Sequence, residues 1–318
     1  MRLTPEFLRG RPVTLALGCL VFAGLSALAA QASNNDPARR ANDPPPLLET
    51  GCATKVAPAP SSPSEIKIVS YNIRWRGGDD LKKLVALLKE DPEVGGATII
   101  GLQEVDRNKK RTGNANTVRV LAEGLGMHYV WAAPPPPERK DDGKRREEPE
   151  EETGVAILSP YPMTEVVRIV LPNEGPDGRK RAAVGATLHV GDQTVRVYSV
   201  HAETRMPVEK KVGHWRAVLE DLKGHASVSR VVILGDFNTI KGKDVRAARQ
   251  LFTEAGFHTP FPDDNATFKV LFFDYKLDWV WLRGLTPTAN GIDKEIDLSD
   301  HWPLWVKAKV GGEVGKRQ

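Results

Sequence analysis

Cysteine is scarce in this sequence, which holds two cysteines among 318 residues. Cys19 lies inside an apolar run at residues 13–30, so loss of that run would leave only Cys52. A chain with a single cysteine forms no internal disulfide, and its stability has to come from a packed core. With 318 residues, 40% of them hydrophobic, the chain is long enough to bury such a core in one or two domains.

A strong excess of charge of either sign is also missing. The formal net charge is +4 and the isoelectric point is about 8.9. Part of the positive charge belongs to Arg2, Arg9 and Arg11 near the N-terminus, where Glu6 is the only opposing acid. The rest of the chain is therefore closer to neutral, and nothing in it demands a nucleic-acid partner.

Two familiar catalytic signatures are absent as well. The sequence contains no His-Glu-x-x-His and no Gly-x-Ser-x-Gly. The zinc peptidases and the serine hydrolases of the α/β type therefore lack the motifs that would identify them here. No internal repeat is present either.

The N-terminal segment differs in composition from everything that follows. Its arginines precede the apolar run of residues 13–30, which ends in small residues. This order is typical of a secretory signal peptide, which we expect to occupy residues 1–32, with cleavage after Ala29 or Ala32. An uncleaved single-span anchor is the alternative, because the run is at the lower length limit for crossing a bilayer. In both cases the body of the protein is exported, and is periplasmic, secreted or membrane-anchored.

The remaining chain divides into a linker, one domain and a short tail. Residues 33–64 are rich in Pro, Ala, Asn and Ser and predict a disordered linker. From residue 65 to residue 311, short apolar runs alternate with helical patterns, as in α/β or α+β layers. Within this domain, residues 134–152 combine prolines with dense mixed charge and predict an exposed inserted loop. Residues 312–318 form the tail.

Helices and strands follow from the spacing of apolar residues in the domain. Helices are expected around residues 81–88, 117–124, 207–223 and 245–254, with Asp79 or Asp80 capping the first and Gly124 or Gly126 ending the second. Strands are expected at residues 66–70, 97–102, 155–158, 166–171, 183–190, 195–200, 231–234, 277–281 and 303–310.

The stretch Arg-Val-Val-Ile-Leu-Gly-Asp-Phe-Asn-Thr at residues 230–239 is the most informative part of the domain. Its apolar run shows no polar alternation, which predicts a strand covered on both faces. Asp236 and Asn238 follow two positions apart, so on an extended backbone both side chains reach the same side. Ligands of α/β folds bind beyond such strand ends. The alternative is that both residues only form an Asx turn or a helix cap.

Polar residues occupy equivalent places on other apolar runs. Asn72, Glu104 and His201 lie at or within about two residues of the C-terminal ends of separate runs. Asp278 lies at the start of another run, and Asp300 with His301 precedes the last one. If the sheets share one edge, these side chains converge in one place. Each residue taken alone is equally compatible with a cap or a turn.

The residue types in this set point to one kind of chemistry. Glu104, Asp300 and Asn72 offer hard oxygen ligands and no thiolate, a set that suits Mg²⁺ or, as the alternative, Mn²⁺. A magnesium ion held by few carboxylates keeps waters and accepts phosphate oxygens. The expected reaction is phosphoester hydrolysis, in which a carboxylate orients the attacking water.

Five short motifs carry a resemblance to a known family. They are Tyr-Asn at 71–72, Gln-Glu-Val-Asp at 103–106, Gly-Asp-Phe-Asn at 235–238, Leu-Asp-Trp-Val at 277–280 and Ser-Asp-His at 299–301. Together they resemble the endonuclease/exonuclease/phosphatase superfamily over roughly residues 66–310. The resemblance implies the α/β (α+β) class and a DNase I-like four-layer α/β/β/α sandwich of two packed mixed sheets. The motifs are specific to the superfamily and say almost nothing about the substrate.

The resemblance also implies metal ligands, carried over position by position. Glu104 would be the principal ligand, and Asn72 and Asp300 would lie close to the ion or its waters. The two basic clusters, at residues 107–111 and 178–181, would attract an anionic substrate if they flank the cleft. Arg107 and Arg111 are then candidate contacts for the substrate phosphate, with a solvated surface as the alternative.

The remaining roles fall on catalytic residues. Asp236 would align or deprotonate the attacking water, and Asn238 would donate to the phosphate. Asp278 would hold the His301 imidazole in the orientation needed to contact phosphate oxygens. His201 would lie near the scissile phosphate and protonate the leaving group. The segment around it reads Ser-Val-His-Ala-Glu, which departs from the Thr-His-Leu segment of the family.

These observations lead to one expectation and one competitor. We expect a divalent-metal-dependent phosphoester hydrolase, a phosphodiesterase, nuclease or phosphatase, that acts outside the cytoplasm as a monomer without an obligate protein partner. Its anionic substrate is a nucleic acid, a phospholipid or a small phosphate ester, and the near-neutral mature charge favours a smaller or membrane-bound one. The competitor is a non-catalytic binding or accessory module at the cell surface, which a wide separation of Glu104 and Asp300 would favour.

Overall fold

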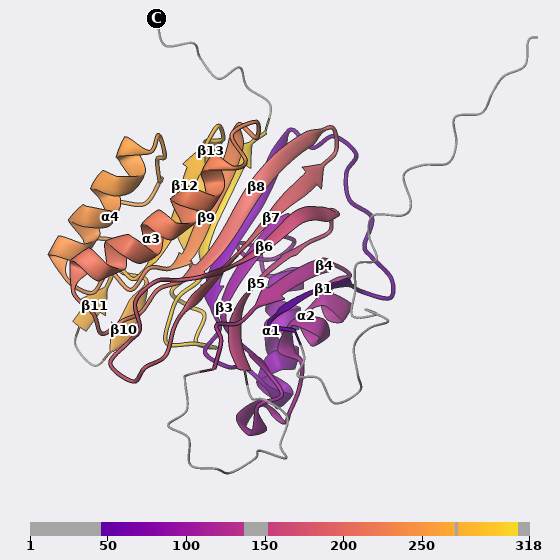
Figure 1. Ribbon diagram of the computed structural model, residues 1–318. Coiled ribbons are helices and arrows are strands. Elements are labelled where there is room, and N and C mark those ends of the chain that lie inside the picture. The colour runs from indigo at the N-terminus through magenta and orange to yellow at the C-terminus, as the bar shows by residue number, and fades with distance from the viewer. Residues whose placement is uncertain (1–45, 137–151, 271–272, 311–318) are drawn as a thin grey trace, which may run out of the picture.

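The computed structural model describes residues 46–136, 152–270 and 273–310. Two sheets pack face to face, with α1 and α2 outside one sheet and α3 and α4 outside the other (Figure 1). In chain order the described elements are β1 (Leu48–Cys52), β2 (Glu65–Asn72), α1 (Gly78–Glu90), β3 (Ile99–Arg107), the 3-10 helix η1 (Lys110–Thr112), α2 (Thr117–Leu125), β4 (His128–Ala132), β5 (Glu152–Ser159), β6 (Met163–Val170), β7 (Ala182–Val190), β8 (Gln193–His201), α3 (Val208–Lys223), β9 (Arg230–Asp236), α4 (Gly242–Glu254), β10 (Phe268–Val270), β11 (Phe273–Tyr275), β12 (Asp278–Arg283), β13 (Thr286–Ile292) and β14 (Leu304–Lys309).

Both large sheets are mixed. Over the described ranges, the first runs in the order β1-β4-β5-β3-β2-β14-β13 and the second in the order β12-β9-β8-β7-β6. The pairs β2–β3 and β8–β9 are parallel, and the other pairs within these sheets are antiparallel. Strands β10 and β11 form a separate hairpin. The four-layer α/β/β/α sandwich of two packed mixed sheets is therefore confirmed.

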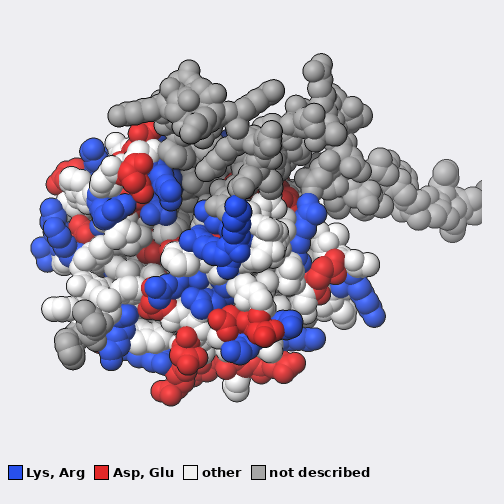
Figure 2. All heavy atoms as spheres, turned by 90° about the horizontal axis from the view of Figure 1, so that it is seen from below, with Lys and Arg blue, Asp and Glu red and all other residues white. Residues whose placement is uncertain are grey.

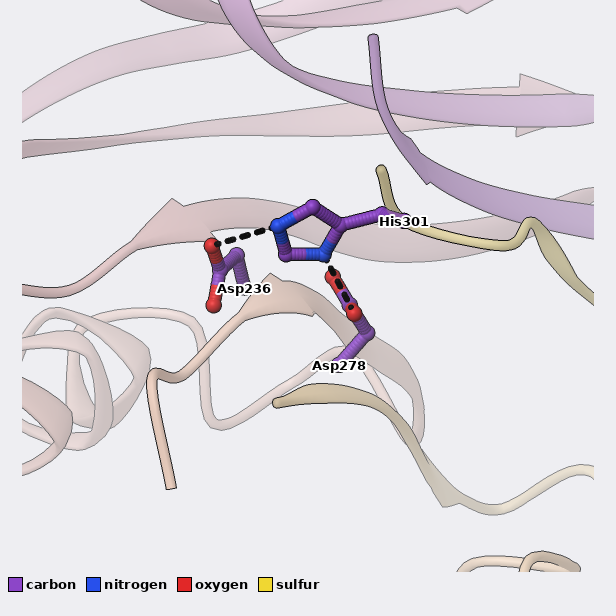
Figure 3. A group of neighbouring side chains, drawn as sticks. All are labelled: Asp236, Asp278 and His301. Carbon is purple, nitrogen blue, oxygen red and sulfur yellow. Dashed lines mark hydrogen bonds and ion pairs between the residues drawn. The ribbon is translucent and has the colours of Figure 1, made fainter. Parts of the chain in front are cut away.

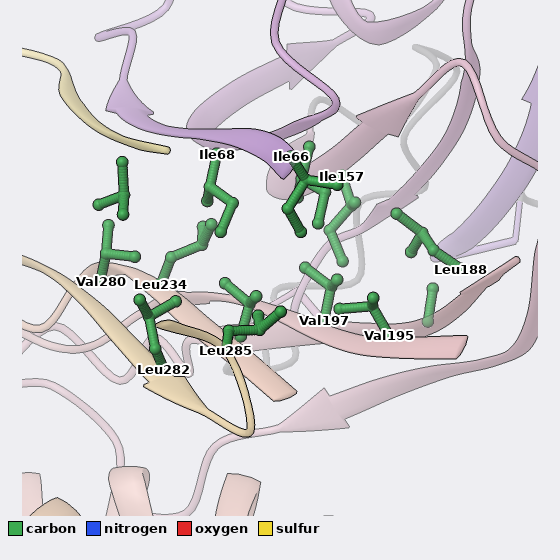
Figure 4. Close-up of a cluster of buried hydrophobic side chains, with 14 of the residues drawn as sticks. Ile66, Ile68, Ile157, Leu188, Val195, Val197, Leu234, Val280, Leu282 and Leu285 are labelled. Carbon is green, nitrogen blue, oxygen red and sulfur yellow. The ribbon is translucent and has the colours of Figure 1, made fainter. Parts of the chain in front are cut away.

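Apolar side chains fill the space between the layers. Ile68, Val197, Leu234 and Val280 belong to the cluster between the two sheets (Figure 4). The strand β9 contributes to two clusters, because its alternate residues Val231 and Ile233 pack on the other face, with α3 and α4. Burial on both faces explains the unbroken apolar run that the sequence shows at this strand.

The four expected helices are confirmed, with corrected details at their ends. Neither Asp79 nor Asp80 caps α1: its N-cap is Gly77, which makes no side-chain capping bond, and both acids pair with lysines of the same helix. Asn116 caps α2 by accepting a hydrogen bond from the backbone of residue 119. Of the two candidate terminators of α2, the structure selects Gly126, whose φ of 66° lies in the left-handed region that glycine tolerates.

The expected disordered linker at residues 33–64 is wrong for its second half. Strand β1 lies within it and pairs antiparallel with β4 at one end of the first sheet. The buried carboxylate of Glu49 fixes this strand, because it accepts hydrogen bonds from Arg107, Arg119 and Tyr129. A strand held by a charged residue and by partners far along the chain leaves no hydrophobic period for sequence reading to detect.

Several expectations fall on segments that the structure does not describe. The signal peptide at 1–32, residues 137–151 of the inserted loop and the tail at 312–318 lie outside the described residues. The last residue of the expected loop, Glu152, is buried at the start of β5 and is not exposed. None of the helices in the described ranges has the length and apolarity needed to cross a membrane.

Candidate active site

The polar residues at the strand ends come together in three dimensions. Asn72 ends β2, and its amide nitrogen donates to Asp236 Oδ2 at the end of β9, over 3.1 Å. The same nitrogen lies 3.5 Å from His301 Nε2. All three residues are buried. Residues separated by 164 and 229 positions in the sequence therefore share one pocket.

Glu104 reaches this pocket through an irregularity in β3. The register between β3 and β5 shifts at this residue, and its φ of 57° is unusual for a residue that is not glycine. Glu104 Oε1 accepts a hydrogen bond from Asn72 over 3.4 Å. Its other oxygen, Oε2, is buried and has no hydrogen-bond partner among the described residues. Burial raises the pKa of the Glu104 carboxyl.

His301 is held from below by a carboxylate. Its Nδ1 lies 2.8 Å from Asp278 Oδ2 (Figure 3). The same oxygen also accepts a hydrogen bond from Thr267 Oγ1. The other ring nitrogen, Nε2, faces Asp236 Oδ2 at 3.8 Å, and the ring of Phe268 packs 4.7 Å from the imidazole. Burial alone would lower the pKa of His301, but the Asp278 carboxylate raises that pKa to about 9. His301 is therefore a cation at neutral pH.

Asp236 lies at the centre of the group. Its strand β9 pairs with β12 so that Asp236 and Asp278 are direct neighbours in the register. Burial, with a further contribution from the charges of Asp278 and Glu104, raises the pKa of Asp236 to about 7 even though His301 opposes the shift. The backbone N–H of Asn238 donates to Asp236 Oδ1 over 2.9 Å and fixes the carboxylate plane. A carboxylate with this pKa can accept a proton near neutral pH.

His201 ends β8 beside the same carboxylates. Its Nε2 lies 3.6 Å from Asp236 Oδ2 and 4.0 Å from Glu104 Oε1. Burial, assisted by the positive charge of Arg181, lowers the pKa of His201 well below its usual value. The imidazole is therefore neutral at neutral pH, which does not fit the role of proton donor to a leaving group.

Hydrogen bonds to its side chain and its backbone hold Asn238 in place. Its φ is 52°, and its side-chain nitrogen donates to the carbonyl of Ala202 over 2.9 Å. The buried ammonium of Lys211 on α3 donates to the carbonyl of Asn238 over 2.6 Å and to Asp244 on α4 over 3.0 Å. Sequence reading treats Lys211 as part of a helix and does not reveal this supporting contact.

Asp300 lies at the rim of the group. Its Oδ2 is 3.1 Å from Arg74 Nη1, and its side chain is partly exposed. The charge of Asp300 contributes to the raised pKa values of Glu104 and His301, so the three groups interact electrostatically. The structure thus brings the two expected metal ligands, Glu104 and Asp300, into the same region.

The two arginines proposed as phosphate contacts differ from each other. Arg107 is 4% exposed and its guanidinium pairs with Glu49 and Glu152, so its assignment as a substrate contact is wrong. Arg111 remains near the surface, where its Nε and Nη2 donate to the two oxygens of Asp106. The two arginines are close in the sequence, but Arg107 belongs to strand β3 and Arg111 to η1.

Two further arginines lie close to the pocket. Arg74 lies two residues after Asn72, in the loop after β2, and pairs with Asp300. Arg181, part of the second basic cluster in the sequence, donates to the buried Glu203 carboxylate over 2.8 Å and acts electrostatically on Glu104. The view of the molecule from below shows Lys and Arg gathered near the middle of this face, with Asp and Glu between them (Figure 2).

The donor set of the pocket fits a hard divalent cation. Asp236, Asp278 and His301 place possible ligand atoms within 4.8 Å of one another. Asp278 Oδ2 is already engaged by His301 and Thr267, so we assign that pair to positioning and not to metal binding. Glu104 Oε2 and Asp278 Oδ1 are both buried without a hydrogen-bond partner in the described part of the chain. Glu104 is the better ligand, because its carboxylate does not also hold an imidazole. Carboxylate and amide oxygens of this kind suit Mg²⁺ or Mn²⁺.

The sandwich and its buried acid cluster define a DNase I-like protein. The model of the endonuclease/exonuclease/phosphatase family matches residues 69–301, which include every residue of the pocket named above. The chain belongs to this family, whose members include nucleases and phosphatases.

Solved structures show the same fold. A family protein from Beutenbergia cavernae DSM 12333 is 19% identical with a TM-score of 0.63, over 79% of this chain and 72% of that one. The human Nocturnin catalytic domain is 15% identical with a TM-score of 0.57, over 77% and 94%. ANGEL2, described as a 2',3'-cyclic phosphatase, is 15% identical with a TM-score of 0.54, over 77% and 95%. No curated protein matches the sequence. At these identities the likeness shows the fold alone.

Proposed function

We propose that this chain is a divalent-metal-dependent phosphoester hydrolase. The observation that carries the proposal is the position of Asp236, which lies between Asn72, His201 and His301 in a buried pocket. Its raised pKa, about 7, makes it a base suited to neutral pH. A purely structural cluster would pair such an acid with a lysine or an arginine.

The protein side chains divide the work between base and cation. Asp236 aligns the attacking water and accepts its proton. His301, charged because Asp278 supports it, donates from Nε2 to a phosphoryl oxygen that gains charge in the transition state. Asp278 and Thr267 keep the imidazole in this orientation. The second amide hydrogen of Asn238 is a further donor toward the phosphate, since the first is directed to Ala202.

The metal ligands in this proposal are Glu104, Asn72 and Asp300. When bound, Mg²⁺ or Mn²⁺ supplies positive charge that stabilises the phosphoryl oxygens. Glu104 is the principal ligand, because its Oε2 is buried without a hydrogen-bond partner among the residues described. Asp300, which pairs with Arg74 at the rim of the pocket, would lie close to the ion or its waters.

We further propose that the enzyme acts outside the cytoplasm, as a monomer, on an anionic phosphoester. The arginines and the apolar run at residues 13–30 support export. Mass determination of the chain recovered from its native host tests this part. The expected mass is that of a chain cleaved after Ala29 or Ala32. A full-length chain in the cytoplasmic fraction would overturn the proposal of export.

The catalytic proposal is tested with the purified mature chain and bis(p-nitrophenyl) phosphate. Hydrolysis is expected with Mg²⁺ or Mn²⁺, and it should stop with chelator. Glu104→Gln and His301→Ala should lose about 10²- to 10³-fold or more in kcat. Glu90→Gln, at the exposed end of α1, and His128→Ala, on β4, are the matched controls and should keep full activity. Full activity of the first pair would reject the site, and a folded chain without any turnover would favour the accessory module.

A further inference from the structure

An exposed tryptophan lies directly beside the proposed metal ligands. Trp75 is 38% exposed, and its backbone N–H donates to the carbonyl of Glu104 over 3.2 Å. The preceding residue, Arg74, donates its backbone N–H to Asn72 Oδ1 over 3.1 Å. The segment formed by Arg74 and Trp75 is thus attached to two residues of the pocket, although the Trp75 ring belongs to none of the apolar clusters of the described residues.

The backbone here has an uncommon conformation. Arg74 has a φ of 44° and Trp75 a φ of 58°, in the left-handed region that bulky residues seldom adopt. Such a conformation persists only where surrounding contacts impose it, and it concentrates at functional sites. The hydrogen bonds to Glu104 and Asn72 are the contacts that impose it here.

The indole ring is also held in place from one side. The guanidinium of Arg111 lies 3.9 Å from the ring centroid of Trp75, a close cation–π contact. Arg111 is itself fixed, because it donates to both oxygens of the buried Asp106, over 2.7 and 2.8 Å. Thr153 donates to Asp106 as well. The ring, with Arg111 behind it, is therefore a preorganised flat surface.

We propose that Trp75, supported by Arg111, stacks against a nucleobase of the substrate. The substrate class is then a nucleotide phosphoester, either a small nucleoside phosphodiester or a single-stranded oligonucleotide. This inference rests on the proposed function and adds to it the group that the enzyme recognises beside the phosphate. Every base offers a flat π-face, so an aromatic ring with nearby guanidinium groups binds nucleotides with little sequence preference.

The charges around the ring favour a base over a lipid chain. Arg74 lies 5.6 Å from the Trp75 ring centroid and pairs with Asp300, so cations flank the ring next to the pocket. A lipid chain would be expected at an apolar surface. In the described ranges, Val270 and Phe273 are exposed on the β10–β11 hairpin, on the His301 side of the pocket. The Trp75 ring lies on the Glu104 side, against two arginines. Among the described residues on this face, acidic side chains interrupt the basic ones (Figure 2), which suits one or a few nucleotides and not a long duplex.

The test compares substrates that differ only in the base. Thymidylyl-thymidine and its analogue with abasic sugars are hydrolysed with Mg²⁺ by the wild type, Trp75→Ala, Trp75→Phe and Arg111→Gln. The measured quantity is the ratio of kcat/KM for the base-containing substrate to kcat/KM for the abasic one. Trp75→Ala should lower this ratio by about 5- to 150-fold, the value of one stacked base, and Trp75→Phe should lower it less. Val120→Ala, an exposed apolar residue on α2, should leave the ratio at the wild-type value.

The outcomes separate this inference from the proposed function. An equal ratio in wild type and Trp75→Ala, both folded by circular dichroism, would overturn the inference and leave the hydrolase intact. If the wild type hydrolyses neither of these substrates nor bis(p-nitrophenyl) phosphate with any divalent ion, the function fails. The inference is then decided by the binding of fluorescent oligothymidylate, which Trp75→Ala should weaken at least 5-fold, and equal or absent binding would overturn it. Loss of activity on phosphatidylcholine or sphingomyelin vesicles in Trp75→Ala, with the nucleotide ratio unchanged, would also overturn it.

Discussion

Two of the buried groups of charged residues in the described part of the sandwich have opposite chemistry. Around Glu49, each carboxylate faces arginines: Arg107 pairs with Glu49 and Glu152, and Arg119 pairs with Glu49. Burial would raise the pKa of Glu49, but hydrogen bonds from the two arginines lower it. This group is balanced and holds β1 against the first sheet.

The group in the pocket is not balanced in the same way. Burial raises the pKa values of Glu104 and Asp236, and the cation that offsets them is His301, which Asp278 also shares. Charges that raise each other's pKa values in a buried place are costly to folding. The Glu49 group therefore stabilises the fold. The pocket group holds its charges in an unfavourable arrangement that a bound cation and a substrate would relieve.

The largest expected effect is a loss of activity, which distinguishes the pocket group from the Glu49 group. Asp236→Asn should lower kcat for a phosphodiester by about 10³-fold, since it removes the base. The same change should leave the thermal midpoint of the metal-free protein equal or higher, because it removes a buried negative charge. Enzyme assays and calorimetry check the two parts, and a fall of the midpoint with unchanged kcat would make Asp236 a structural residue.

The next effect concerns stability at the balanced group. Arg107→Met should destabilise the fold by about 3–5 kcal/mol, because it leaves the Glu49 and Glu152 carboxylates buried beside an apolar side chain. Urea unfolding measures this value. Arg119→Met is the matched control in the same group: its side chain is half exposed, so about 1 kcal/mol is expected. Both variants should keep the kcat of the folded enzyme. A selective loss of kcat in Arg107→Met would contradict the conclusion that the Glu49 group serves stability and the pocket group serves catalysis.

A smaller effect is the pH dependence of the metal-free protein. Folding raises the pKa of Asp236 from 3.8 to about 7 and that of His301 from 6.5 to about 9. Both groups bind protons more tightly in the folded state, so the stability that they contribute is present at low pH and is lost as the pH rises, through about 7 for Asp236 and about 9 for His301. Thermal midpoints between pH 5 and 9.5 should therefore decline more in wild type than in a Asp236→Asn, His301→Gln double variant. Equal slopes would contradict these shifts.

More of the pocket group than of the Glu49 group could be predicted from the sequence. The apolar run of β9, followed by Asp236 and Asn238, and the polar ends of other strands predicted convergence on one edge, because strand ends in a layered fold are neighbours. The two-sheet architecture itself came from the family motifs. The Glu49 group was missed because its ion pairs join residues 45 to 70 positions apart and follow no period.

Local geometry accounts for the other differences. Glu104 reaches the pocket because its own backbone lies in the left-handed region, at an irregularity of its strand. The residues beside it in the sequence give no turn signal. Trp75 reads as one apolar residue in a loop, whereas its position depends on Glu104 and on Arg111, which lie in other elements. The low pKa of His201 depends on its burial, which no sequence motif reveals.

Calorimetric titration with Mg²⁺ near pH 7, in two buffers of different ionisation enthalpy, tests the central claim most directly. The wild type should bind the ion and release protons, because the cation lowers the raised pKa values of Glu104 and Asp236. Glu104→Gln should weaken binding at least about tenfold, whereas Arg107→Met should bind as the wild type does. Binding of equal strength in Glu104→Gln, or none in the wild type with either Mg²⁺ or Mn²⁺, would contradict the account.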